Sequence, residues 1–182
     1  MTFHATPLDG LYEITLAPVA DARGRFFRLF CEQDFDPIRA GLHFTQINLS
    51  ETKQAGTVRG MHYQTGPAAE AKLIRCVRGR VFDVAVDIRL HSSTFLQWHG
   101  VELGADGPAV FIPEGFAHGF QAMSDDVQLL YMHTAPWTPG CEGGLRHDDS
   151  RLGIDWPLPP VLVSQKDHEY PLINDSFAGV RT

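Results

Sequence analysis

One stretch of nine residues, Val81 to Arg89, constrains the fold more than any other part of the chain. Its alternating hydrophobic positions are Phe82, Val84, Val86 and Ile88, and the positions between them include Asp83, Ala85 and Asp87. A period of two is the pattern of a β-strand whose two faces meet different surroundings. The chain is therefore expected to build at least one well-defined sheet.

Other segments repeat this short-strand pattern, with turn residues between them. The further strands we expect are Gly100–Leu103, Ala109–Ile112 and Val127–Met132, with a turn at 105–108. The best candidate for a short helix is Cys31–Leu42. Regularly spaced short strands with turn signals predict an all-β fold, and we expect a double-stranded β-helix (jelly roll) with a few short helices.

The length of the chain favours a single domain. With 182 residues, 43% of them hydrophobic, it can bury one good core. Proline and glycine become frequent from Pro136 onwards. We therefore expect one domain over residues 1–182, with a C-terminal segment that wraps the body.

Charge and cysteine content narrow the partners and the compartment. The 22 acidic and 15 basic residues give a net charge of −7, which argues against a nucleic acid as partner. The three cysteines form no CxxC pair and are expected to be free thiols in a reducing cytosol. No signal peptide and no membrane span are visible, so we expect a cytoplasmic protein.

Two histidine motifs carry the chemistry. Val58–Gln64 and Phe111–Phe120 each place one histidine, His62 or His118, at the end of a strand-like segment beside glycines. Inward-facing residues from different strands of a closed sheet converge. We expect both imidazoles in one pocket.

The second motif, with Pro113, Gly115 and His118, resembles a motif of the cupin superfamily, whose fold is a jelly roll. Many cupins hold a metal with three histidines and a carboxylate. Here His62 is followed by Tyr63 and Gln64, so a second histidine is missing from the first motif. Most metal sites need three or four protein ligands, and we predict no metal. Both histidines are then free for acid–base or hydrogen-bonding work.

Seven blocks in order, together with the His118 motif, resemble the dTDP-4-dehydrorhamnose 3,5-epimerase family, a cupin-like family of nucleotide-sugar enzymes. The blocks are Asp21–Phe26, Gln46–Ser50, Arg59–Gln64, Ala71–Gly79, Phe82–Arg89, Ile154–Pro157 and Ser164–Asp167. The resemblance implies a nucleoside-diphosphate 4-keto-6-deoxyhexose as substrate, no cofactor and a role in polysaccharide or other carbohydrate biosynthesis. It also implies a homodimer, often with an exchanged N-terminal strand.

The resemblance also assigns the catalytic residues. The ketone acidifies the protons on C3 and C5, and His62 would be the base, with Asp167 as its charged partner. Asp83 is our second choice for that partner. Tyr131 would donate a proton to the other face, and Lys72 would stabilise the enolate oxygen.

Further positions match the family's substrate-binding residues. Arg23 and Arg59 suit paired phosphate oxygens, since the guanidinium fork can bind two of them. Lys166 corresponds to a nucleotide-binding position, Phe26 would stack near the base, and His118 would hydrogen-bond in the pocket. The polar positions that would line the substrate are Gln46, Asn48 and Glu142.

Two departures from the family leave the substrate and the outcome open. The family commonly has glutamate at the position of Arg28. A carboxylate accepts a hydrogen bond from thymine N3–H, whereas arginine only donates. Arg28 therefore suits a cytidine base, or its side chain swings outward and pairs with phosphate. Trp137 replaces a tyrosine near the sugar. It either restricts the enzyme to one epimerisation, at C3 or C5, or packs on the sugar and leaves both.

We therefore predict a dTDP-sugar 3,5-epimerase first, and a mono-epimerase, with a CDP-linked sugar as its possible substrate, second. Three other classes stay open: a 3,4-ketoisomerase on a similar jelly roll, a sugar-nucleotide binding module without catalysis, and a metal-dependent cupin.

Overall fold

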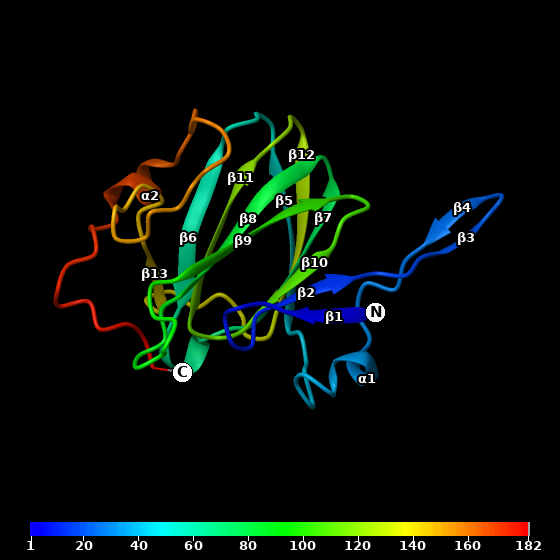
Figure 1. Ribbon diagram of the computed structural model, residues 1–182, viewed down its shortest axis with the longest axis horizontal. Helices are drawn as coiled ribbons and strands as arrows, with labels where there is room; N and C mark the ends of the chain where they lie inside the picture. Colours follow the sequence, from blue (N-terminus) through cyan, green and yellow to red (C-terminus); the bar gives the residue numbers. More distant parts are fainter. Residues whose placement is uncertain (182) are drawn as a thin grey trace.

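Two antiparallel β-sheets face one another in the computed structural model, which describes residues 1–181 (Figure 1). The six-stranded sheet has the order β1 (Thr2–Ala5), β2 (Tyr12–Thr15), β10 (Ala109–Ile112), β7 (Lys72–Arg78), β12 (Val127–His133) and β5 (Gln46–Thr52). The five-stranded sheet has the order β13 (Glu142–Gly144), β6 (Val58–Gln64), β11 (Phe116–Ala122), β8 (Arg80–Asp87) and β9 (Trp98–Gly104). The chain passes repeatedly from one sheet to the other, as in a jelly roll, so the predicted all-β fold is confirmed.

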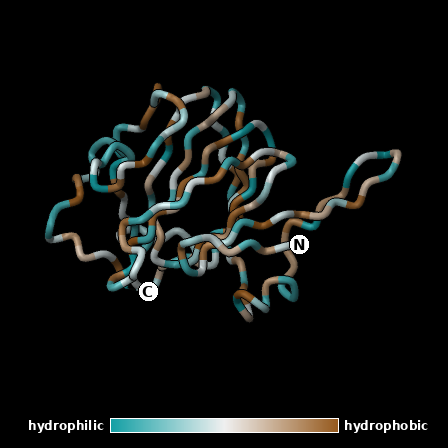
Figure 2. Tube along the Cα trace, viewed as in Figure 1, coloured by the Kyte–Doolittle hydropathy of each residue, from teal (hydrophilic) through white to brown (hydrophobic). Residues whose placement is uncertain are grey.

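Strand β8 confirms the alternation from which the fold was predicted, and it shows which face points inward. Val84 and Val86 pack on the outer side, with Leu145 and Leu152 from the C-terminal part of the chain. Ala85 packs in the core between the sheets. The more polar face of the strand therefore points into the body, and along the strands the tube in Figure 2 changes repeatedly between hydrophilic and hydrophobic residues.

Three hydrophobic clusters form the layers. The central cluster joins both sheets, with Ile74 and Cys76 from β7 meeting Phe120 from β11. A second cluster covers the outer face of the six-stranded sheet, where Phe35 of helix α1 (Glu32–Phe35) is fully buried beside Phe111. Because the space between the sheets is filled by the central cluster, polar side chains that remain inside must line a cavity or form pairs.

The chain after β13 runs along the outside of the five-stranded sheet (Figure 1). The N–H of Val58 donates to the carbonyl of Leu162, and the N–H of Val180 donates to the carbonyl of Ile88. The segment contains helix α2 (Gln165–Glu169), which contacts β6. These contacts bring residues from the end of the sequence next to the strand that carries His62.

The other predicted elements are found, Ala109–Ile112 with the expected limits and the rest with changed limits. The expected strands correspond to β9, β10 and β12. Because β9 and β10 lie in different sheets, the turn between them connects the two sheets. The expected helix over residues 31–42 was too long, since α1 ends at Phe35 and turns follow it. Pro37 has no N–H to continue helical hydrogen bonding. A 3₁₀ turn at Gly66–Ala68 completes the helical structure of the described residues.

A two-stranded hairpin stands away from the body (Figure 1). It consists of β3 (Val19–Asp21) and β4 (Gly24–Phe26) and pairs with neither large sheet. Val19 and Phe26 are 72% and 74% exposed. Such exposure of large apolar side chains is typical of an interaction surface.

Candidate active site

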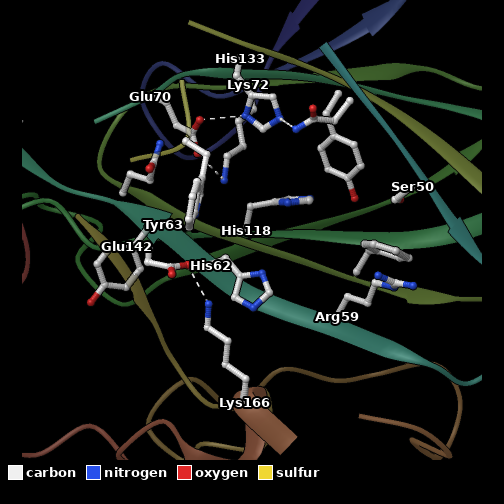
Figure 3. A pocket seen from close by; sticks show the side chains of 15 residues that line it. Ser50, Arg59, His62, Tyr63, Glu70, Lys72, His118, His133, Glu142 and Lys166 are labelled. Carbon is white, nitrogen blue, oxygen red and sulfur yellow. Dashed lines mark hydrogen bonds and ion pairs between the residues drawn. The ribbon is translucent and has the colours of Figure 1, made fainter. Parts of the chain in front are cut away.

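A cavity of about 310 Å³ opens between the two sheets. Its wall includes nine of the residues predicted from the sequence: Asn48, Arg59, His62, Lys72, His118, Tyr131, Trp137, Glu142 and Lys166 (Figure 3). His62 and His118 are directly opposite one another in the pairing of β6 with β11. Both predicted histidines therefore lie in one pocket.

His62 is paired with Asp167. Nε2 of the imidazole lies 2.7 Å from Oδ1 of the carboxylate, and Oδ2 accepts a bond of 3.2 Å from the N–H of Gly60. Ser164 caps helix α2 by accepting from the N–H of Asp167, which holds this residue at the first turn. Burial raises the pKa of Asp167, but hydrogen bonds from His62 and from the Gly60 backbone outweigh it, and the net pKa is lowered. A buried, ionised Asp167 fixes the ring of His62 and stabilises its protonated form.

His118 is paired with Asp83 instead, at 2.8 Å between Nε2 and Oδ2. Our second choice of Asp83 as the partner of His62 was therefore wrong. The alternation of β8 correctly placed Asp83 on the inward face, but the register of β8 with β11 brings it to His118. Burial lowers the pKa of His118, against the opposite effect of Asp83. His118 is thus suited to hydrogen bonding as a neutral ring.

Tyr131 enters the cavity from β12, on the sheet opposite His62. Its ring stacks on His133, with 5.9 Å between centroids and 14° between planes, and meets His118 edge to face. Burial by the surrounding protein raises the pKa of the Tyr131 phenol far above its ordinary value. The phenol is therefore protonated at neutral pH and has a proton to give.

Lys72 and Glu70 form a buried ion pair of 3.3 Å in the cavity wall. Glu70 also accepts from His133. At the other side of the cavity, Nζ of Lys166 lies 2.7 Å from Oε2 of Glu142. The cavity thus holds cations at two separated points.

Six lining residues were missed by the sequence analysis: Ser50, Tyr63, Gln64, Glu70, Phe120 and His133. Five of them lie two positions from a predicted residue. Because side chains two apart on a strand share a face, the alternation rule applied from each predicted residue would have found four of these on strands. Glu70 lies just before β7, where that rule is weaker.

Besides Asp167, which contacts His62 but does not line the cavity, four predicted residues lie outside it. Arg23 and Phe26 are on the hairpin, where Arg23 pairs with Asp21, and Arg28 lies 3.5 Å from Asp34. The fourth residue is Gln46, whose side-chain oxygen accepts from the backbone N–H of Trp137 at the cavity wall. The hairpin residues are separated from the cavity because the hairpin points away from the body (Figure 1).

Within residues 1–181, no three histidine, cysteine, aspartate or glutamate side chains are arranged to hold a metal ion. No helix in the same part of the chain has the length and hydropathy to cross a bilayer.

The fold and the site define a cupin-like jelly-roll enzyme with an acid–base pocket between its sheets. The profile of the dTDP-4-dehydrorhamnose 3,5-epimerase family matches residues 5–175 of the chain. The chain belongs to this family, and it is accordingly an isomerase of the epimerase type.

Individual relatives agree over nearly the whole length. The dTDP-4-dehydrorhamnose 3,5-epimerase of Salmonella typhimurium is 43% identical over 160 residues, covering 86% of this chain and 87% of its own. That of Sinorhizobium fredii is 39% identical over 178 residues, covering 91% of each chain. The dTDP-6-deoxy-D-glucose-3,5-epimerase of Legionella pneumophila, solved in complex with dTDP-4-keto-L-rhamnose, has a TM-score of 0.92 and 36% identity, covering 100% of this chain and 98% of its own.

Proposed function

We propose that the chain epimerises a dTDP-linked 4-keto-6-deoxyhexose at both C3 and C5. One observation carries the proposal: a histidine–aspartate pair and a protonated tyrosine, His62–Asp167 and Tyr131, line one cavity from opposite sheets. Inversion of a carbon next to a ketone needs a base on one face and an acid on the other. The thymidine assignment is supported by the matched relatives, which are described as dTDP-sugar enzymes.

The proposed reaction begins with proton removal. Because Nε2 of His62 faces Asp167, Nδ1 is the atom that takes the proton from C3 or C5. The electron pair of the broken C–H bond moves to the C4 oxygen and forms an enolate. The ammonium of Lys72 donates to that oxygen, in the manner of an oxyanion hole.

The second half restores the ketone with inverted configuration. The electron pair returns to the carbon, which takes the phenolic proton of Tyr131 on the face opposite His62. The raised pKa of Tyr131 keeps that proton available until the enolate forms. His118, neutral and fixed by Asp83, is placed to hydrogen-bond to the sugar or its enolate.

The proposed diphosphate site uses cations on the cavity wall. Arg59 and Lys166 line the cavity on the side of His62, and a guanidinium suits two phosphate oxygens at once. Glu142 holds Lys166 through a bond of 2.7 Å. Asn48 and Trp137 complete the substrate wall, with Gln46 holding the backbone of Trp137.

The base is proposed to bind in a homodimer. The hairpin carries Arg23 and Phe26 far from its own cavity, and Arg28 follows it. In a homodimer with an exchanged N-terminal segment, these three residues would complete the site of the partner. The exposure of Phe26, at 74%, supports this arrangement.

We place the enzyme in the cytoplasm, consistent with the free cysteines of residues 1–181.

The experiment follows deuterium by NMR while the protein acts on dTDP-4-keto-6-deoxyglucose in D₂O. The proposal expects deuterium at C3 and at C5, together with the L-lyxo product. Deuterium at only one carbon would overturn the double epimerisation in favour of a mono-epimerase, and would attribute the limit to one carbon to Trp137. Absence of exchange, with exchange of the CDP analogue, would overturn the thymidine assignment and attribute base choice to Arg28.

A further inference from the structure

Four side chains along the cavity wall are connected in series by one ion pair and two hydrogen bonds (Figure 3). Nζ of Lys72 lies 3.3 Å from Oε1 of Glu70, and Oε2 of Glu70 lies 2.8 Å from Nδ1 of His133. Nε2 of His133 in turn lies 3.4 Å from Nδ2 of Asn48. Glu70 therefore connects a candidate catalytic lysine to a residue of the substrate wall.

The register of the six-stranded sheet produces this arrangement. His133 is directly opposite Lys72 in the pairing of β12 with β7. Asn48 is directly opposite Tyr131 in the pairing of β12 with β5, two positions from His133. Glu70 precedes β7 by two residues and so reaches both Lys72 and His133 from one end of the sheet.

The donors and acceptors among these four side chains are consistent with one protonation state. Burial raises the pKa of Glu70, but the hydrogen bond from His133 and the charge of Lys72 outweigh it, and the net pKa is lowered. An ionised Glu70 accepts the Nδ1 proton of His133, which leaves Nε2 free to accept from the amide of Asn48. Both carboxylate oxygens of Glu70 are thus occupied by protein donors, Oε1 by Lys72 and Oε2 by His133.

We propose that Glu70 is a positioning residue that holds the ammonium of Lys72 at the place where the enolate oxygen develops, with His133 fixing Glu70 from the other side. This inference rests on the proposed epimerase function. Lysine carries its charge on a flexible four-carbon stem, so without a partner its ammonium samples many positions. A preorganised donor stabilises developing charge without having to reorganise during the reaction.

The test compares Glu70→Gln with wild type, using initial rates of epimerisation of dTDP-4-keto-6-deoxyglucose. The amide keeps the size of the side chain but removes its charge. We expect kcat to fall about 10- to 100-fold while KM changes by less than about threefold, because Lys72 acts on charge that develops in the transition state. Glu114→Gln is the matched control, because Glu114 is a half-buried ion-pair partner of Arg39 outside the cavity. The kcat of this control variant should stay within about twofold of the wild-type value.

A double-mutant cycle with Lys72→Met separates positioning from a general structural effect. If Glu70 acts through Lys72, Glu70→Gln should lower kcat by less than about twofold in the Lys72→Met background. An equal fold-loss in both backgrounds would overturn the inference, and so would an unchanged kcat in the single Glu70→Gln variant.

A second variant keeps the inference testable if Glu70→Gln does not fold. His133→Phe preserves an aromatic ring against Tyr131 but removes both hydrogen bonds. It should lower kcat about 3- to 10-fold, again only when Lys72 is present. A wild-type protein that does not epimerise the substrate would overturn the proposed function and this inference together. An active wild type whose kcat survives His133→Phe and Glu70→Gln would overturn this inference alone.

Discussion

The imidazole of His62 and the carboxylate of Asp167 lie 2.7 Å apart, although 105 residues separate them in the chain. His62 comes from strand β6 in the five-stranded sheet, and Asp167 from helix α2 in the segment that follows the last strand. The side chain of Asp167 is nearly fully buried, while that of His62 is 44% exposed to the cavity. The pair therefore has a fixed, protected carboxylate and an accessible imidazole, which is the arrangement a general base requires.

The first prediction concerns this pair. Asp167→Asn should lower kcat by about 100-fold or more, because an amide cannot stabilise the imidazolium and allows the wrong tautomer of His62. KM should change little, since Asp167 does not line the main cavity. Initial rates with the dTDP-4-keto sugar measure both constants. Asp148→Asn, at an exposed carboxylate of the same segment that pairs with Arg146, is the control. A rate for Asp167→Asn equal to that of the control would show that His62 acts without this partner.

The second prediction separates the base from the acid. In D₂O, His62→Asn should abolish exchange of the C3 and C5 protons, because nothing removes them. Tyr131→Phe should abolish inversion but keep exchange, since His62 can remove a proton and return a deuteron to the same face. NMR of the recovered sugar distinguishes labelled, uninverted substrate from product. Labelled substrate with His62→Asn would require another base on that face of the sugar.

Strands could be predicted from the sequence because their pattern is a local property. A period of two gave the face of β8 that carries Asp83. The residues of the cavity wall, in contrast, came from the histidine motifs and the family resemblance. The pairing of Asp83 with His118 depends on strand register between distant segments, which no local pattern specifies. For the same reason the contact of His62 with Asp167 came only from the family resemblance.

The hairpin illustrates a different limit. Arg23 and Phe26 were predicted as substrate residues, yet they lie outside the cavity of their own chain. Neither motif nor alternation reveals that a hairpin points away from the body, since its direction is set by packing of the segments around it. The network of Glu70 and His133 was missed because its residue types carry no motif, although His133 shares the strand face of Tyr131.

The third prediction concerns the acid stability of a buried carboxylate outside the cavity. Asp87 is fully buried and accepts from Arg89, Ser92 and Thr94. Burial raises its pKa, but the bonds, led by that from Arg89, outweigh it and lower the pKa from 3.8 to about 2. Because the folded pKa lies below the unfolded value, Asp87 contributes about 2 kcal/mol to the free energy of unfolding above about pH 4, and this is lost as the pH falls toward 2.

Denaturant unfolding of wild type and Asp87→Asn at several pH values measures this contribution. The difference in unfolding free energy should be about 2 kcal/mol at pH 7 and should narrow steadily below pH 4. Asp125→Asn, at an exposed carboxylate, should show no such narrowing. A difference that is the same at pH 7 and pH 3 would mean that the loss comes from packing and not from the charge of Asp87.

The fourth prediction concerns the close approach of β6 and β11, which sets the distance between the two histidine strands. Gly60 has φ +120°, and a Cβ placed there would lie 2.5 Å from Cα of Gly119 and 2.7 Å from the carbonyl oxygen of His118. Gly60→Ala should therefore destabilise the fold by more than about 3 kcal/mol, since backbone cannot move aside as a side chain can. Activity should fall with it, because the N–H of Gly60 also donates to Asp167.

Gly140→Ala is the control that separates contact from backbone strain. Gly140 also has a positive φ, +83°, but a Cβ there would meet nothing within 4 Å. Its loss should be about 1 kcal/mol, the cost of placing an L-residue in that region. Equal losses for the two variants, measured by denaturant unfolding, would show that φ alone makes Gly60 necessary. A larger loss at Gly60 means that strand contact requires it, because any side chain there would separate the strands that hold His62 and His118 opposite each other.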